Sequence, residues 1–136
     1  MKVLVTGGAG YIGSHVVMHL CDAGHDVVVI DDLSLGDKKA VDLRAKFIQG
    51  SIKNKEDLNQ CLNDIETVMH FAAFKSAGES MKNPQKYSQN NMIGTLTLLE
   101  SMIEHKIKNI IFSSTAAVYG YPEYLPLDEK HPLSPI

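Results

Sequence analysis

Residues 3–17 read VLVTGGAGYIGSHVV, an apolar run that stops at closely spaced glycines and resumes with helical spacing. Lys2–Thr6 is rich in β-branched side chains and predicts a strand, and Gly13–Ala23 predicts a helix that Gly24 ends. The loop between them, GAGYIG (8–13), fits the pattern GxGxxG. A strand, such a loop and a helix in that order are typical of a turn that holds a pyrophosphate against the helix N-terminus.

An acidic residue closes the next predicted strand. The run DVVVI (Asp26–Ile30) is followed by Asp31, 18 residues after Gly13. A carboxylate there accepts hydrogen bonds from both hydroxyls of an adenosine ribose and repels a 2′-phosphate, so we expect NAD rather than NADP. Lys38 and Lys39 lie several residues beyond the strand end, where we expect them to be solvated. A glycine-rich turn without any ligand is the alternative that this context disfavours.

Size and composition predict one soluble domain. The chain has 136 residues, of which 44% are apolar and 21% charged, as in ordinary globular proteins. Its 13 Lys and Arg against 16 Asp and Glu give a net charge of −3, and no basic cluster suits nucleic acid. No apolar stretch reaches the ~20 residues that span a membrane, and no signal peptide precedes the first strand. We therefore expect a cytoplasmic protein without nucleic-acid or membrane partners.

The cysteines and histidines do not predict a metal site. Cys21 and Cys61 lie in separate predicted helices without CxxC spacing. His15 and His19 stand four residues apart on one helical face, but no acidic residue completes a HExxH pattern. We interpret that spacing as a coincidence of the helix.

Strands and helices alternate along the rest of the chain. The further predicted strands are Ala45–Ile48, Thr67–Phe71 and Asn109–Ser113, and the further helices are Lys55–Asn63 and Tyr87–His105. Continuous apolar strands separated by helices indicate an α/β fold with a doubly wound parallel sheet, Rossmann-like, of about five strands. Gly120–Ile136 is rich in proline and predicts an extended loop. Such a sheet rarely finishes on a long loop, so we expect residues 1–136 to be an incomplete Rossmann-type domain.

Several stretches carry a resemblance to a known family. The glycine loop TGGAGYIG (6–13) resembles the extended short-chain dehydrogenase/reductases, and later stretches resemble the UDP-glucose 4-epimerases within them. These stretches are HFAAFKSAGES (His70–Ser80), NNMIGTLTLLESM (Asn90–Met102), IIFSSTAAVYG (Ile110–Gly120) and LPLDEKHPLSP (Leu125–Pro135). The resemblance implies a bound NAD that removes hydride from C4 of a UDP-hexose and returns it to the other face.

The resemblance also assigns residues. It places Phe71–Ala73 beside the cofactor, Lys75 at its pyrophosphate or ribose, and Asn90 and Ser113 near the nicotinamide. Thr115 would hydrogen-bond the reacting sugar oxygen, although a hydroxyl at a strand end also serves as a cap. With the glycine loop and the adenine side, the predicted cofactor set is Gly7, Gly10, Tyr11, Ile12, Gly13, Asp31, Ser51, Ile52, Phe71, Ala72, Ala73, Lys75, Asn90 and Ser113.

This sequence departs from the family at two points. Ser51 stands where the family usually has an aspartate for the adenine amino group, which weakens that contact by ~1 kcal/mol. The family's Tyr-x-x-x-Lys, which supplies the proton-transferring tyrosine, is absent from these 136 residues, so we expect no epimerase activity from them alone. The helix Tyr87–His105 would contribute to a homodimer interface in the family.

Two other functions stay open. A nucleotide-sugar dehydratase or decarboxylase would share the glycine loop, but a dehydratase is expected to have acidic residues after the strand hydroxyl, where this chain has Ala116 and Ala117. A non-catalytic module that binds NAD or a protein partner is the second alternative. Whether the sugar is acetylated is left open.

Overall fold

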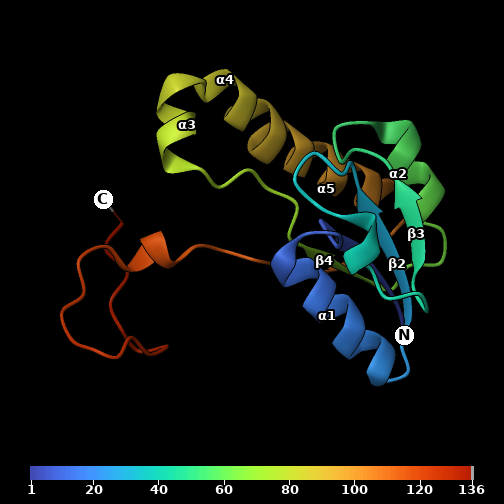
Figure 1. The fold of residues 1–136 in the computed structure, drawn as a ribbon, viewed down its shortest axis with the longest axis horizontal. Helices are drawn as coiled ribbons and strands as arrows, with labels where there is room; N and C mark the ends of the chain where they lie inside the picture. The colour runs from blue at the N-terminus through green and yellow to red at the C-terminus, as the bar shows by residue number, and fades with distance from the viewer. Residues whose placement is uncertain (136) are drawn as a thin grey trace.

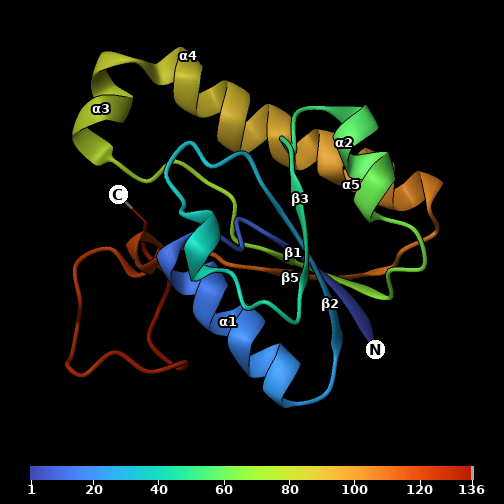
Figure 2. The ribbon, with the colours of Figure 1, turned by 45° about the vertical axis from the view of Figure 1, so that its right-hand side comes forward.

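Five parallel strands form one sheet at the centre of the molecule (Figures 1 and 2). The computed structural model describes residues 1–135. The sheet has the order β3-β2-β1-β4-β5, and its strands are β1 (Lys2–Thr6), β2 (Asp26–Asp31), β3 (Lys46–Gln49), β4 (Thr67–His70) and β5 (Asn109–Phe112). The first strand lies in the middle, and the chain order reverses between β1 and β4. The predicted Rossmann-like fold is confirmed.

Helices cover both faces of this sheet. Helix α1 (Tyr11–Asp22) packs on one face, and α2 (Lys55–Cys61) and α5 (Gly94–Glu104) pack on the other (Figure 1). Alternate residues of β1 serve the two layers, because Val3 and Val5 join the cluster under α1 while Leu4 joins the cluster under α2 and α5. The central strands β1 and β2 are mostly apolar because both of their faces are buried.

One long helical run crosses the second face. Helix α4 (Pro84–Tyr87) continues through the π-helical segment η2 (Ser88–Ile93) into α5. The run begins three residues before the predicted Tyr87, because Asn83 caps it by accepting from the Lys86 N–H at 3.2 Å and Pro84 occupies its first turn. A π-helical turn inside an α-helix is frequent at functional sites.

A short helix that the periodicity does not predict precedes this run. Helix α3 (Ala77–Lys82) buries none of its residues and begins at Ser76, whose hydroxyl accepts from the Glu79 N–H at 3.4 Å. Glu79 joins α3 to α4, because it accepts from Lys86 Nζ at 2.5 Å and from the Tyr87 hydroxyl at 2.8 Å. Polar contacts, rather than a buried face, hold α3 in place.

The C-terminal residues leave the sheet as an arm, coloured orange to red in Figures 1 and 2. Apart from the 3-10 turn η3 (Ala116–Tyr119), its described residues contain no helix or strand, as predicted for Gly120 onward. The arm folds around His131, which is buried, accepts from the Glu123 N–H at 2.9 Å and packs against the rings of Tyr119 and Tyr124.

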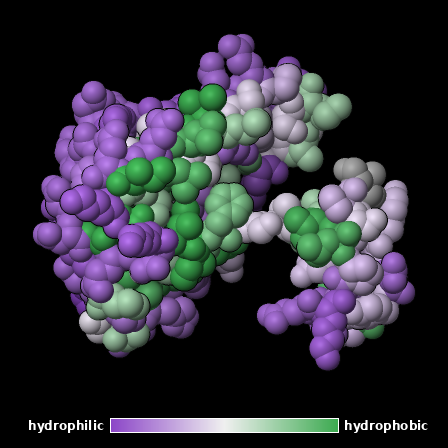
Figure 3. Space-filling model, turned by 180° about the vertical axis from the view of Figure 1, so that it is seen from behind, coloured by the Kyte–Doolittle hydropathy of each residue, from purple (hydrophilic) through white to green (hydrophobic). Residues whose placement is uncertain are grey.

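Strand β5 is exposed along its length, and Ile111 and Phe112 expose 53% and 57% of their surface. Seen from behind, the body of the molecule shows hydrophobic surface beside the arm (Figure 3). An apolar edge strand that stays open to water is unusual for a parallel sheet, which normally is covered on both faces.

Cys61 and His15 make contacts within the fold. Burial raises the pKa of the Cys61 thiol to about 12, and His15 uses Nδ1 to bond the carbonyl of Tyr11 at 2.8 Å. Residues 1–135 contain no group of three or more His, Cys, Asp or Glu placed to share a metal ion. No helix within that range combines the length and hydropathy needed to cross a bilayer.

Candidate functional site

The glycine loop brings backbone into contact with backbone. Gly7 has a φ of +71°, and a Cβ there would lie 2.7 Å from the backbone nitrogen of Ala72. A Cβ on Gly13 would lie 2.1 Å from the carbonyl oxygen of Gly7. Both positions therefore require glycine: Gly7 because of its positive φ and its close contact, and Gly13 because of its close contact alone. The loop thus draws the start of α1 against the end of β1.

The first turn of α1 presents free backbone N–H groups. Gly10 is its N-cap and offers no side chain, and no acidic residue lies in the first turn. Tyr11 and Ile12 expose 81% and 56% of their surface. An uncapped helix start with a positive dipole end attracts an anionic group.

Asp31 ties the glycine loop to the end of β2. One carboxylate oxygen accepts from the Ala9 N–H at 3.0 Å, and the other accepts from the Leu33 N–H at 2.9 Å. The neighbouring Asp32 accepts from the Ser34 N–H at 2.9 Å. Each carboxylate oxygen has a second lone pair. Asp31 is therefore fixed in orientation and can still accept from a ligand hydroxyl.

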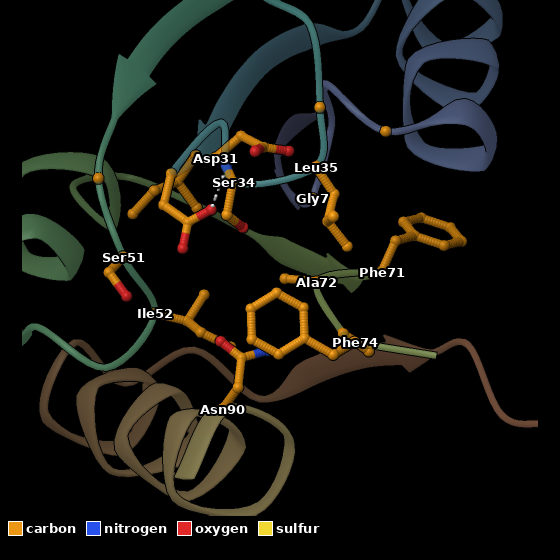
Figure 4. A pocket seen from close by; sticks show the side chains of 16 residues that line it. Gly7, Asp31, Ser34, Leu35, Ser51, Ile52, Phe71, Ala72, Phe74 and Asn90 are labelled. Atoms are coloured by element: carbon orange, nitrogen blue, oxygen red, sulfur yellow. Dashed lines mark hydrogen bonds between the residues drawn. The ribbon is translucent and has the colours of Figure 1, made fainter. Parts of the chain in front are cut away.

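A pocket opens between these elements at the carboxyl ends of β1, β2 and β4 (Figure 4). Side chains of Asp31 and Ser34 lie on one side of it, Ser51 and Ile52 on another, and Phe74 opposite them. The pocket collects nine of the predicted cofactor residues. These are Gly7, Gly10, Asp31, Ser51, Ile52, Phe71, Ala72, Ala73 and Asn90.

The sequence does not predict seven of the lining residues, namely Ile30, Asp32, Ser34, Leu35, Gly36, Gly50 and Phe74. Four of them belong to the turn after β2, which carries no periodicity. The pair Asp31-Asp32 at a strand end was the available signal, since such residues often fold the following turn onto their own carboxylates. Phe74 lies inside the quoted stretch His70–Ser80 and contacts Tyr87 at a ring distance of 5.8 Å.

Other predicted residues lie outside this lining. Gly13 is buried beneath the loop, and Lys75 is exposed before α3. Ser113 follows β5 and donates its N–H to the His70 carbonyl at 3.1 Å. Thr115 stands at the start of the arm and accepts from the Ala117 N–H at 3.2 Å, which caps η3. The capping role of Thr115 is thus present, and its O–H proton stays free to donate.

Ser51, which stands where the family usually has an aspartate, is fixed by hydrogen bonds to the residues that follow it. Ser51 donates its N–H to Asp57 Oδ2 at 2.9 Å, and its hydroxyl accepts from the Lys53 N–H at 3.3 Å. Ile52 is buried against the core. Ser51 therefore offers the pocket a neutral hydroxyl in a fixed place.

The family follows from comparison with known proteins. Residues 3–136 match the model of the NAD dependent epimerase/dehydratase family. The chain belongs to this family. It is 51% identical to the UDP-glucose 4-epimerase of Lactobacillus helveticus over 138 aligned positions, which include 100% of this chain and 42% of that protein. The chain thus spans about two fifths of the length of such relatives.

Solved structures of the epimerase/dehydratase family share the fold as well. A crystal structure of UDP-glucose 4-epimerase superposes with a TM-score of 0.91 at 44% identity, and covers 99% of this chain and 42% of that one. The Bifidobacterium longum UDP-glucose 4-epimerase, in complex with NAD+ and UDP, superposes with a TM-score of 0.90 at 37% identity, over 98% of this chain and 43% of that one. The resemblance to this enzyme family is confirmed.

Proposed function

We propose that this pocket binds NAD and that the chain is the cofactor-binding part of a UDP-glucose 4-epimerase. The observation that carries the proposal is the place of the pocket. It lies outside the carboxyl ends of β1 and β4, where the order of the sheet reverses, and ligands of doubly wound sheets bind at that point. The NAD in the Bifidobacterium longum relative supports it.

The residues present fit the parts of NAD. Gly7 and Gly10 line the pocket next to the uncapped start of α1, where a pyrophosphate would meet the positive end of the helix dipole. Asp31 has lone pairs for the ribose hydroxyls. The lining described for the pocket contains two carboxylates, Asp31 and Asp32, and no Lys or Arg, so a 2′-phosphate would meet only like charge.

When bound, the cofactor accepts hydride from C4 of the sugar and returns it. The residues of this chain would hold and orient the cofactor. The N–H groups in the first turn of α1 would bind phosphate oxygens, and Asp31 would fix the adenosine ribose. Phe71–Ala73 would form part of the pocket wall. We assign Lys75, Asn90 and Ser113 to the cofactor and Thr115 to donating its hydroxyl proton toward the sugar oxygen, on the strength of the family resemblance.

Binding of NAD tests the cofactor assignment. Isothermal titration calorimetry of the chain with NAD and with NADP should give a measurable Kd for NAD and at least about tenfold weaker binding of NADP. Equal affinities would contradict the role of Asp31 and Asp32. With NAD and UDP-galactose we expect no steady formation of UDP-glucose, because these residues contain no Tyr-x-x-x-Lys. Sustained turnover would contradict that part.

We also propose that the helical run forms a homodimer, as the family resemblance implies. Met92, Ile93, Leu96 and Ile103 lie along it and expose between 53% and 74% of their surface. Apolar area of this kind is typical of interfaces. Sedimentation velocity would detect the dimer. UDP-hexose as substrate of the whole protein and a cytoplasmic location stay predictions, which an activity assay of the whole protein and a fluorescent fusion would test.

A further inference from the structure

A buried histidine lies directly beneath the pocket. His70 ends β4 and is 3% exposed. The strand register places it beside Thr6 of β1 and Phe112 of β5. Its Nδ1 lies 2.6 Å from the Thr6 hydroxyl, and its Nε2 lies 2.9 Å from the Thr95 hydroxyl of α5. Both ring nitrogens are thus used, in a place that water does not reach.

The donors along this chain of hydrogen bonds have a single direction. Thr95 donates its proton to the carbonyl of Asn91 at 2.6 Å, so its oxygen can only accept from His70, and Nε2 carries the ring proton. The unprotonated Nδ1 therefore accepts from Thr6. The Thr6 oxygen in turn accepts the N–H of Ala72 at 3.3 Å. Every hydroxyl donates once and accepts once when His70 is uncharged.

Both ends of this chain of bonds hold the segment that lines the pocket. At one end, Thr6 holds the N–H of Ala72. At the other, Asn91 accepts the Phe74 N–H at 2.9 Å and donates to the Phe74 carbonyl at 2.8 Å. Phe71 follows the last residue of β4 and still donates its N–H to the Thr6 carbonyl at 3.0 Å. Residues 72–74 lie beyond the paired strand, so these side-chain bonds support them in place of the sheet. All four residues line the pocket.

We propose that Thr6, His70, Thr95 and Asn91 form a positioning relay that holds Phe71–Phe74 in the conformation that receives the cofactor, with His70 in its uncharged Nε2–H form. The proposal rests on the proposed function, since the cofactor it positions is NAD. The four residues of the relay are positioning residues, because none of them lines the pocket, whereas Phe71–Phe74 do.

The hydrogen-bond and stacking partners of the His70 ring are uncharged. The side chains that hydrogen-bond to its ring or stack on it are Thr6 from β1, Thr95 from α5 and Phe112 from β5, whose ring centroid lies 5.5 Å away. None of the three titrates. Protonation would add a proton at Nδ1 facing Thr6, whose own O–H would then lose its acceptor in a buried place.

A pair of threonine variants separates this relay from ordinary helix contacts. Thr95→Val removes the hydroxyl and keeps the shape of the side chain. Thr97→Val is the matched control, because Thr97 donates to the carbonyl four residues earlier at 3.0 Å, as Thr95 does, but lies outside the relay. Thr95→Ser restores the hydroxyl. Amide hydrogen exchange without cofactor and calorimetric titration with NAD provide two independent measurements.

We expect Thr95→Val to lose exchange protection at Ala72 and Phe74 and to bind NAD about tenfold more weakly, whereas Thr97→Val and Thr95→Ser stay within about twofold of the unaltered chain. Unchanged protection and affinity in Thr95→Val would overturn the relay, as would a uniform loss of protection across the sheet. If the unaltered chain does not bind NAD, the proposed function is wrong. Normal NAD binding with an unaffected Thr95→Val overturns the relay alone.

Discussion

Replacement of Gly13 by alanine tests the packing of the glycine loop. The added Cβ would lie 2.1 Å from the carbonyl oxygen of Gly7 and 2.9 Å from the Cα of Gly8. All the nearest atoms belong to the backbone, so no side chain can rotate away. Relief requires the start of α1 to move away from the loop by at least about 1.4 Å, the difference between this distance and an ordinary contact of about 3.5 Å.

The expected loss of stability is large for one methyl group. Overpacking at a rigid backbone site costs about 3 kcal/mol, the upper part of the usual range. For a chain of 136 residues that cost corresponds to a fall in Tm of about 10 °C. Movement of α1 also carries the N–H groups of its first turn away from the pocket, so we expect NAD to bind at least about tenfold more weakly.

Two other glycines serve as matched controls. Gly78, in α3, has no atom within 4 Å of an added Cβ and an ordinary φ, so Gly78→Ala should raise the stability by about 0.5 kcal/mol. Gly24 has equal room but a φ of +77°, so Gly24→Ala should cost about 1 kcal/mol through backbone strain alone. Urea denaturation of the three variants, followed by circular dichroism, measures each free energy of unfolding.

The three variants should differ in their free energy of unfolding in a fixed order. Gly13→Ala must be the least stable, Gly24→Ala intermediate and Gly78→Ala the most stable, and only the first should impair NAD binding. If Gly13→Ala unfolds within about 0.5 kcal/mol of Gly78→Ala, or binds NAD as the unaltered chain does, the close approach does not constrain the loop as described.

Three further predictions concern charge, pH and the open strand. Burial lowers the pKa of His70 from its ordinary value of 6.5, so the unfolded chain binds the proton more readily and the free energy of unfolding should fall as the pH drops below about 6.5. Urea denaturation at several pH values should show a smaller fall for His70→Gln. The same pH dependence in both proteins would argue against this role of His70. Asp31→Ala should weaken NAD binding and narrow the difference between NAD and NADP, as measured by calorimetry, because the carboxylate that the Ala9 and Leu33 N–H groups fix is lost; an unaltered ratio would show that another group selects the cofactor. Ile111→Thr, on the exposed β5, should reduce self-association in sedimentation velocity and change the free energy of unfolding by less than about 0.5 kcal/mol. A large loss of stability would mean that the Ile111 side chain is packed.

The parts of the fold with a regular apolar pattern were predictable. All five strands were expected within one or two residues of their observed bounds, because each contains consecutive apolar residues between turn signals. Helix α3 was missed because it buries nothing, so no periodicity marks it. Its signal was chemical: Ser76 and Glu79 have the spacing of a capping box. Asn83-Pro84 likewise marked the true start of the long helical run.

The site was predictable where it depends on local sequence. The glycine loop and Asp31 follow from spacing within one strand-loop-helix unit. The support of the pocket from below was not predictable, because His70 becomes a neighbour of Thr6 and Thr95 only through the strand register and the packing of α5. A histidine at the end of an apolar strand has no sequence pattern that distinguishes a bonded core residue from a ligand.

The central place of β1 has a consequence for synthesis. Gly7 meets Ala72, which is made 65 residues later, and at about 5–20 residues per second the ribosome takes about 3 to 13 s to supply it. During that interval β1 can pair with β2, but its other edge has no partner until β4 emerges. An apolar strand edge left open for seconds is a binding site for chaperones and for other nascent chains. The first strand to be translated thus completes its hydrogen bonds only after β2 and β3 have been made.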